Sequence, residues 1–206
     1  MDFKISEEQQ MIISTTKSFV EKELYPHEEL VERTGEIPPE LLKEIQKKAI
    51  NAGLYAANIP EKFGGGGLDT LSWLLFEKEL GRTNYALHWT CEARPTNIHC
   101  AGTPKQREKY IEPCIRVETR DSLAMTEPEA GSDVAAMAMS AELVGEEYVL
   151  NGEKTWISNA GIADRYTVFA RTAEATGAKG ISCFVVESDT PGLDVSERID
   201  LVAPHP

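Results

Sequence analysis

The chain has 206 residues, of which 41% are hydrophobic and 27% are charged, and its formal net charge at pH 7 is -13. This length allows one large or two small domains with a sizeable core. The acidic balance argues against nucleic acid as a partner, because phosphates need a basic face, and it disfavours anionic membranes.

Targeting and metal signals are weak. No apolar run approaches the roughly 20 residues of a membrane span, and residues 1–4 lack the basic-then-apolar layout of a signal peptide. We therefore expect a soluble, cytoplasmic protein.

The cysteines form no C-x-x-C pair and no zinc spacing with histidine, so we expect buried, reduced thiols and no metal site. They are Cys91 and Cys100, expected on one helical segment, Cys114, and Cys183 within an apolar strand.

The first half of the chain has the periodicity of helices. Ser6–Gln9 has the form of a capping box, and helical spacing of apolar residues continues to Tyr25-Pro26, where proline should stop the helix. A second helix is expected from about Pro38 to Gly53. A third should run from about Asp69 to Gly81, with four leucines facing other helices: Leu71, Leu74, Leu75 and Leu80.

Two further helical segments complete this half. The segment Tyr85–Cys100 contains Pro95, so it should kink or break there. Thr103–Gln106 combines an N-cap threonine, a proline at the first helical position and a glutamine at the third, which predicts another helix start. That helix should end before Glu118.

The run of four glycines, Gly64–Gly67, invites a phosphate-loop interpretation. However, no Gly-Lys-Ser/Thr follows it, and no strand-to-helix G-x-G-x-x-G context surrounds it. We expect a flexible loop before the third helix.

From about Thr119 the period becomes strand-like, and the composition break near Glu118 predicts a helical domain over residues 1–118 and a β domain over 119–206. The strands expected are Ser122–Thr126, Met139–Leu143, Tyr148–Leu150, Lys154–Ser158, Arg165–Arg171, Ile181–Glu187 and Leu193–Ser196. Asn151-Gly152 predicts a type I′ hairpin, and Gly145–Glu147 a second turn. Short antiparallel strands with turns between them favour a barrel or sandwich, and the absence of βαβ alternation disfavours a Rossmann fold. The predicted fold class is α+β.

Two stretches of the β part have the residues of a ligand site. Leu123–Asp133 is an apolar strand that opens into a turn, in which Thr126 and Ser132 supply hydroxyl donors and Gly131 permits close backbone approach. In Asn151–Ser158, an indole next to a hydroxyl suits a flat ring with a polar edge. Taken alone, the first stretch could also be an ordinary capped turn, and the second is better explained by a core tryptophan in a hairpin.

Together these stretches resemble the acyl-CoA dehydrogenase family. Ala124–Asp133 (AMTEPEAGSD) is similar to the family signature, and Asn151–Ser158 (NGEKTWIS) is similar to its flavin-contacting strand. Further matching segments, in the family's order, are Ile59–Gly65, Gly67–Asp69, Glu79–Arg82 and Gly102–Tyr110.

The resemblance implies an N-terminal helical domain, a middle β domain and a C-terminal helical bundle, of which only the first two match this chain. In the family a carboxylate from the bundle removes the substrate's α-proton while the β-hydrogen leaves as hydride to flavin N5. No residue here matches that base, so we expect it beyond Pro206 and expect the chain, taken alone, to be a fragment that is inactive. Glu127 and Glu129 are not assigned this role.

The resemblance also assigns the cofactor site. It implies FAD contacts from Leu123, Met125, Thr126, Gly131 and Ser132, and from the second stretch at Trp156, Ile157 and Ser158. Thr126 resembles the donor to the isoalloxazine edge, and Ser132 resembles a residue near the pyrophosphate that also faces the CoA substrate. Glu129 departs from the glycine that is frequent in the family, and its charge would weaken pyrophosphate binding modestly.

The implied activity is α,β-dehydrogenation of an acyl-CoA in fatty acid metabolism. The implied partners are an electron-transfer flavoprotein as acceptor and further copies of the protein in a homodimer or homotetramer. An acyl-CoA oxidase or flavin monooxygenase of the same fold, or a non-catalytic thioester-binding scaffold, are alternatives. Polar and aromatic residues in the helical part are compatible with a short or polar acyl group, and equally with inter-helix packing: Tyr85, His88, Trp89, Glu92 and Arg94.

Overall fold

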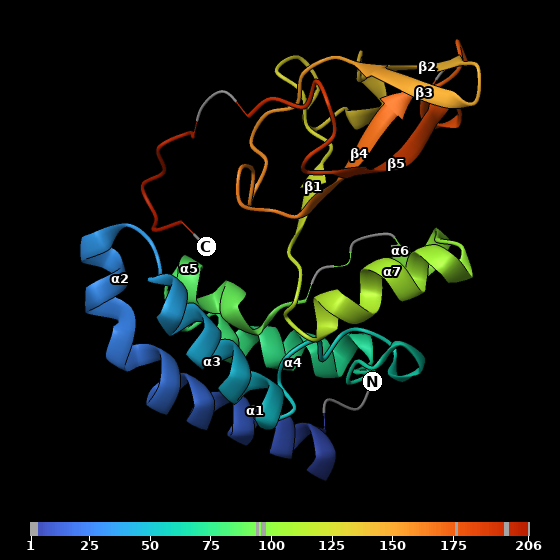
Figure 1. The fold of residues 1–206 in the computed structure, drawn as a ribbon. Helices are drawn as coiled ribbons and strands as arrows, with labels where there is room; N and C mark the ends of the chain where they lie inside the picture. The colour runs from blue at the N-terminus through green and yellow to red at the C-terminus, as the bar shows by residue number, and fades with distance from the viewer. Residues whose placement is uncertain (1–3, 94, 96–97, 176, 196–197, 206) are drawn as a thin grey trace. The chain divides into compact units, whose positions relative to one another are not determined.

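In the computed structural model, residues 4–93, 95, 98–175, 177–195 and 198–205 are described. Their contacts divide the chain into two compact units. The helical unit comprises Met1–Pro95, Thr103–Glu118 and Asp200–Pro206, and the β unit comprises Thr96–Gly102 and Thr119–Ile199. Figure 1 shows helices in the first and an open sheet in the second, which confirms the predicted α+β class.

The first helices begin where local sequence predicts and continue further. Ser6 forms the capping box with Gln9 at the start of α1 (Glu7–Phe19). The predicted stop at Tyr25-Pro26 is wrong, because the backbone widens into a π turn at Val20–Leu24 and tightens into a 3-10 turn at Tyr25–His27. It then continues as α2 (Glu28–Thr34). Pro26 is tolerated because it lies in the first turn of this new segment.

The core of the helical unit lies between α1, α3 (Pro39–Asn51) and α4 (Thr70–Leu80). In α4 the inward side chains are Ser72, Phe76 and Leu80, which are spaced four residues apart and therefore share one face. The prediction that Leu71 and Leu74 face other helices is wrong, since their exposed fractions are 54% and 58%.

The segment after α4 breaks near Pro95, as predicted. It forms α5 (Tyr85–His88) with a 3-10 turn at Trp89–Cys91, and later α6 (Ile98–Ala101). Cys91 and Cys100 therefore do not share one helical segment. Cys91 and Cys114 are buried, but Cys100 and Cys183 are exposed, which corrects the expectation of four buried thiols. Burial raises the pKa of Cys91 to about 12, so its thiol stays protonated.

The helix α7 (Pro104–Ile115) starts at Thr103, which forms the predicted capping box with Gln106. Arg116 and Val117 lie beyond its end, so the helix ends before Glu118 as expected. Because the capping boxes at Ser6 and Thr103 satisfy N–H groups within three residues, local sequence was sufficient to locate these two helix starts.

The glycine run is tightly packed and not a flexible loop. All four of its N–H groups donate to backbone carbonyls: Gly64 to Glu61 at 2.8 Å, Gly65 to Pro60 at 3.4 Å, Gly66 to Ala56 at 3.1 Å and Gly67 to Ile59 at 2.9 Å. A Cβ atom at residue 65 would lie 2.1 Å from the Ile59 carbonyl oxygen. Glycine is therefore required here for backbone packing.

The β unit contains a five-stranded sheet in which β4 (Arg165–Arg171) is central. It pairs in parallel with β1 (Asp121–Ala124) and antiparallel with β5 (Ile181–Glu187). A hairpin of β2 (Ser140–Val144) and β3 (Glu147–Asn151) joins β4 through one parallel pair, Ser140 with Arg171. The sheet is thus mixed. The expectation of purely antiparallel strands is wrong, because β1 and β2 each pair with β4 in parallel. A buried cluster of Ala124, Ala163, Tyr166 and Val168 forms the core.

Two predicted strands are absent. Lys154–Ser158 is irregular, and so are residues 193–195, while Ser196 lies outside the described residues. The turn at Gly145 joins β2 to β3, but Asn151-Gly152 forms no hairpin. A Cβ at residue 152 would lie 2.8 Å from the Met139 Cα, so this glycine allows close chain approach and does not form a turn.

No helix in the described ranges is long and apolar enough to cross a membrane.

Candidate functional site

The two predicted ligand stretches lie side by side in the β unit. The Thr155 amide donates to the Thr126 carbonyl at 2.9 Å. The Ser122 hydroxyl donates to the Ser158 carbonyl at 2.6 Å, and the Asn159 side-chain amide donates to the Asp121 carbonyl at 3.1 Å. These three bonds join the end of β1 to the irregular segment that follows β3, over separations of 29 to 38 residues in sequence.

At the end of β1 the acceptors are occupied and the donors are not. The Met125 carbonyl accepts from Lys154 Nζ at 3.0 Å, and the Thr126 carbonyl accepts from Thr155. Among the described residues, none accepts a hydrogen bond from the amide or the hydroxyl of Thr126. Thr126 is half-buried, so this edge presents donors to a ligand that offers acceptors.

The loop after Thr126 is a compact turn. Glu127 and Ala130 exchange two backbone hydrogen bonds, at 3.0 and 3.1 Å, which folds the chain at Pro128-Glu129. Gly131 and Ser132 follow on the surface, and within the described residues their amides have no acceptor. No atom lies within 4 Å of a Cβ built at Gly131, so a ligand can approach the backbone there.

Trp156 combines two unusual features. Its φ is +58°, in the left-handed region, and its side chain is 64% exposed. A bulky residue in this conformation is strained by about 1–2 kcal/mol, and exposure of an indole adds no burial to offset that cost. Such strain at an exposed aromatic residue is a pointer to ligand contact.

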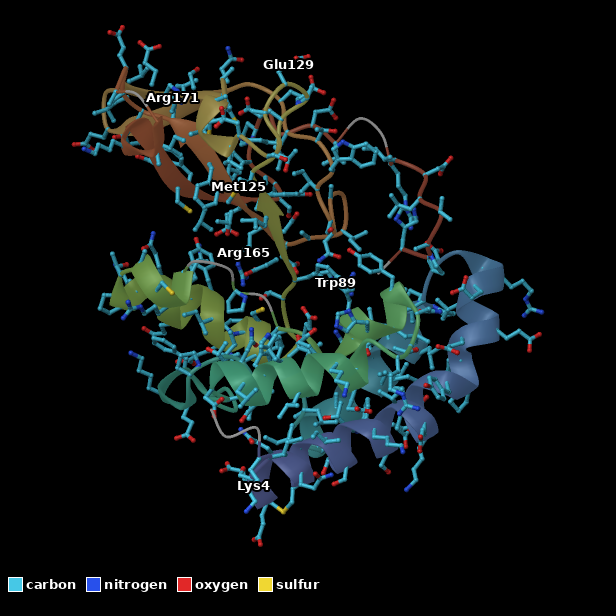
Figure 2. All side chains as sticks on the ribbon, turned by 180° about the vertical axis from the view of Figure 1, so that it is seen from behind. Lys4, Trp89, Met125, Glu129, Arg165 and Arg171 are labelled. Atoms are coloured by element: carbon cyan, nitrogen blue, oxygen red, sulfur yellow. The ribbon has the colours of Figure 1, made fainter. Side chains whose placement is uncertain are left out.

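The remaining predicted residues have distinct environments. Leu123, in β1, is 41% exposed. Met125 is half-buried and lies at the end of this strand (Figure 2). Ile157 is half-buried and packs against the β core cluster. The amides of Trp156, Ile157 and Ser158 have no acceptor within the part of the chain that the structure describes.

Sequence reasoning missed Lys154 and the structural role of Glu127. Their side chains form an ion pair at 2.8 Å, with exposed fractions of 8% and 6%. Glu127 also accepts from the amides of Ala138 at 2.6 Å and Met139 at 3.0 Å. Burial raises the pKa of Glu127, but Lys154 and these two amides outweigh it and hold the pKa below its ordinary value. The two residues are 27 positions apart, so no local signal in the sequence pointed to their pairing.

Arg171, at the end of β4, fixes the far part of the same loop. Its guanidinium donates to the carbonyls of Ala135 at 2.7 Å, Met137 at 3.3 Å and Ala175 at 3.0 Å. Because arginine has five donors in a rigid fork, one side chain holds several carbonyls in fixed positions. This residue was also absent from the predicted site.

The polar residues of the helical unit form contacts between helices. His88 Nε2 lies 2.9 Å from a Glu77 carboxylate oxygen in α4 and 3.1 Å from one of Glu92. Tyr85 and Trp89 pack edge to face, with ring centroids 5.7 Å apart. These contacts fit the packing interpretation of the set, and Arg94 lies outside the described residues.

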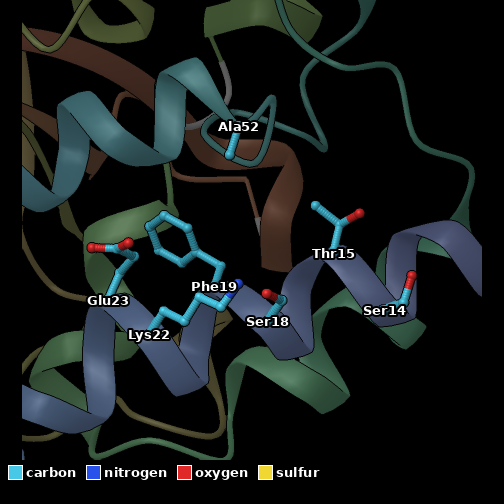
Figure 3. Close-up of a pocket in the computed structure, with 7 residues that line it drawn as sticks. All are labelled: Ser14, Thr15, Ser18, Phe19, Lys22, Glu23 and Ala52. Carbon is cyan, nitrogen blue, oxygen red and sulfur yellow. The ribbon is translucent and has the colours of Figure 1, made fainter.

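A hollow on the helical unit is separate from all predicted site residues. It is lined mainly by residues of α1 and by the adjoining turn (Figure 3): Ser14, Thr15, Ser18, Phe19, Lys22, Glu23 and Ala52. Its lining has three hydroxyl side chains, one positively charged residue (Lys22) and one negatively charged residue (Glu23). This lining has neither a concentrated charge nor a strongly apolar wall, so we assign it no ligand.

Comparison with known proteins identifies the family of the chain. Residues 6–118 match the model of the acyl-CoA dehydrogenase N-terminal domain, and residues 122–204 match that of the acyl-CoA dehydrogenase middle domain. The chain therefore belongs to the acyl-CoA dehydrogenase family.

Individual relatives extend the match over nearly the whole chain. A probable acyl-CoA dehydrogenase, YngJ of Bacillus subtilis, is 36% identical over 97% of this chain and 53% of its own length. A glutaryl-coenzyme A dehydrogenase in complex with glutaryl-CoA has a TM-score of 0.84 at 32% identity, covering 100% of this chain and 54% of its own. An FAD complex of PigA has a TM-score of 0.88 at 29% identity, and the match covers 100% of this chain and 55% of the PigA chain. The chain thus spans about half the length of the proteins it matches.

Proposed function

We propose that this chain forms the FAD-binding part of an acyl-CoA dehydrogenase. The observation that carries the proposal is the pattern at Thr126: the carbonyls of Met125 and Thr126 are occupied, while the donors of Thr126 have no acceptor among the described residues. An isoalloxazine ring offers acceptors along its polar edge. The residues present therefore fit this cofactor.

Each predicted residue has a defined part in the proposal. The amide and hydroxyl of Thr126 would hold the ring edge, with Leu123 and Met125 contributing the strand that leads to it. Trp156 would lie against the ring, and the backbone of Ile157 and Ser158 would border it. The free amides of Gly131 and Ser132 suit the pyrophosphate, with Ser132 also facing the CoA part of the substrate.

FAD, when bound, supplies an acceptor for the hydride that leaves the β-carbon of an acyl-CoA thioester. The contribution of this chain is electrostatic and positional. Preorganised donors at Thr126 stabilise negative charge that develops on the ring edge, as an oxyanion hole does. Trp156 excludes water from one side of the site.

We assign the catalytic base to no residue of this chain. Both carboxylate oxygens of Glu127 accept hydrogen bonds from the protein, so this residue is not free to remove a proton. Glu129 is exposed at the outer end of the turn (Figure 2). In our proposal the base is a carboxylate of the C-terminal bundle, and the codons that follow Pro206 in the gene test this directly.

The proposal extends to the cellular setting. We place the enzyme in fatty acid metabolism in the cytoplasm, as a homodimer or homotetramer that passes electrons to an electron-transfer flavoprotein. The family membership and a similar dehydrogenase solved with glutaryl-CoA support the acyl-CoA substrate of this proposal.

The experiment is to purify the product of the whole gene and measure its flavin. We expect a yellow protein whose flavin absorbance bleaches when an acyl-CoA is added without oxygen. Absence of flavin absorbance after purification and FAD reconstitution would contradict the proposal. Reduction of an electron-transfer flavoprotein is the expected reoxidation route, whereas oxygen consumption with peroxide release would indicate an oxidase.

A further inference from the structure

Lys154 is a buried cation in an unexpected place. Its side chain is only 8% exposed, and its ammonium contacts the Met125 carbonyl at 3.0 Å and Glu127 Oε1 at 2.8 Å. The Met137 sulfur lies 4.0 Å from the same nitrogen. Three contacts from one ammonium therefore reach the beginning and the end of the loop from Met125 to Met139.

Glu127 completes this connection. Its Oε2 accepts from the Ala138 amide and its Oε1 from the Met139 amide, in addition to Lys154. The ion pair thus joins Met125 to residues 138–139 across the intervening turn, which contains Thr126, Gly131 and Ser132. Both side chains of the pair are more than nine-tenths buried.

We propose that Lys154 is a positioning residue for the cofactor site, which holds the loop from Met125 to Met139 closed with the donors of Thr126 directed to the ligand. The proposal rests on the assignment of this loop to FAD. Lys154 contributes in two ways: it fixes the Met125 carbonyl, and it compensates the buried carboxylate on which the end of the loop depends.

The charge on Lys154 is essential to this role. A neutral side chain of the same length would leave the Glu127 carboxylate buried without its counter-ion and the Met125 carbonyl without a donor. The loop would then open locally, and the free carbonyl would face an isoalloxazine edge that itself carries acceptors. Loss of FAD affinity should follow from the loss of preorganisation.

The first test measures the loop without FAD. In Lys154→Met, amide hydrogen exchange should accelerate at least about tenfold at Ala138 and Met139, which corresponds to about 1.4 kcal/mol. Exchange in β4 and β5 should not change. The control is Lys48→Met, which removes another lysine that contacts a glutamate at 2.8 Å, but one that is 40% exposed. Unchanged exchange at Ala138 and Met139 in a folded Lys154→Met protein would overturn the proposal.

The second test measures FAD affinity, by flavin fluorescence in the product of the whole gene. Lys154→Met should weaken FAD binding at least about tenfold (about 1.4 kcal/mol). Lys154→Arg keeps the charge but changes the donor geometry. Its FAD affinity should lie between that of Lys154→Met and that of the wild type. If Lys154→Met does not fold, Lys154→Arg decides: weaker FAD binding by a folded protein supports the proposal, and wild-type affinity overturns it. A wild type that binds no FAD would contradict the proposed function instead, while the exchange test would still report on the loop.

Discussion

Two loops of this protein have the composition of ligand-binding loops. They differ in whether their backbone amides donate hydrogen bonds within the protein. In Gly64–Gly67 every N–H donates to a backbone carbonyl of residues 56–61. In the loop after β1, the amides of Thr126, Gly131 and Ser132 have no acceptor among the described residues, and the nearby carbonyls of Met125 and Thr126 are occupied. Glycine content therefore does not distinguish the two loops, whereas the hydrogen bonding of their amides does.

The two loops are also held in place differently. The glycine loop is fixed by its own backbone and by the absence of side chains. The loop after β1 is fixed from outside, by the Lys154–Glu127 pair and by Arg171. Substitutions that act on these two kinds of support should have different consequences, and four predictions follow in decreasing order of effect.

Glu127→Gln should have the largest effect on stability, about 3–5 kcal/mol at neutral pH, because it leaves a buried Lys154 uncompensated. The folded-state pKa of Glu127 is lowered. Its contribution is therefore present above the ordinary carboxyl pKa of about 4.3 and is lost as pH falls through the lowered value. Urea unfolding between pH 7 and pH 3 should show the difference between wild type and variant shrinking with acidification. A difference that stays constant would show that the charge of Glu127 is unimportant.

Gly65→Ala should destabilise the fold by about 3 kcal/mol, because the added Cβ would overlap the Ile59 carbonyl and force the backbone apart. Gly131→Ala is the matched substitution in the other loop, where a Cβ meets nothing within 4 Å. It should leave the unfolding midpoint unchanged and weaken FAD binding. Thermal unfolding of both variants is the measurement, and equal destabilisation would remove the distinction between the loops.

Thr126→Val should reduce the rate of flavin reduction by about 100-fold, because it removes a donor needed when negative charge develops. Acyl-CoA binding should change much less, since that donor is used mainly in the transition state. Stopped-flow flavin reduction provides the test. Thr172→Val, which removes a hydroxyl that contacts Ser182 at 2.9 Å, serves as the control in the same unit. An unchanged reduction rate in Thr126→Val would refute the role of the hydroxyl.

Trp156→Gly should have the smallest effect on stability and the opposite sign. Glycine adopts a φ of +58° without strain, so we expect stabilisation of about 1 kcal/mol with loss of FAD affinity. Trp156→Phe, which keeps both the strain and an aromatic ring, should retain most of the affinity. A destabilised Trp156→Gly protein would mean that the indole supports the fold and not the ligand.

The sequence predicted those features that depend on neighbouring residues. Both capping boxes, at Ser6 and Thr103, act within three positions, and the bounds of β4 and β5 follow from continuous apolar runs. The two proposed ligand stretches were selected by family resemblance and not by periodicity.

Features that depend on distant contacts could not be predicted. The parallel pairing of β1 with β4 joins residues 44 apart, such as Asp121 and Arg165. The left-handed Trp156 and the close approach of Gly152 to Met139 replaced the expected strand and hairpin. The Lys154–Glu127 pair spans 27 residues, so no local pattern indicated that these two charges are buried together.

Amide hydrogen exchange, compared with and without FAD, tests the distinction between the two loops most directly. We predict that FAD slows exchange at Thr126, Gly131, Ser132 and residues 156–158, whose amides have no acceptor among the described residues. The amides of Gly64–Gly67, already bonded to the backbone, should not change. Protection of the glycine loop without protection of Thr126 and residues 156–158 would contradict the account.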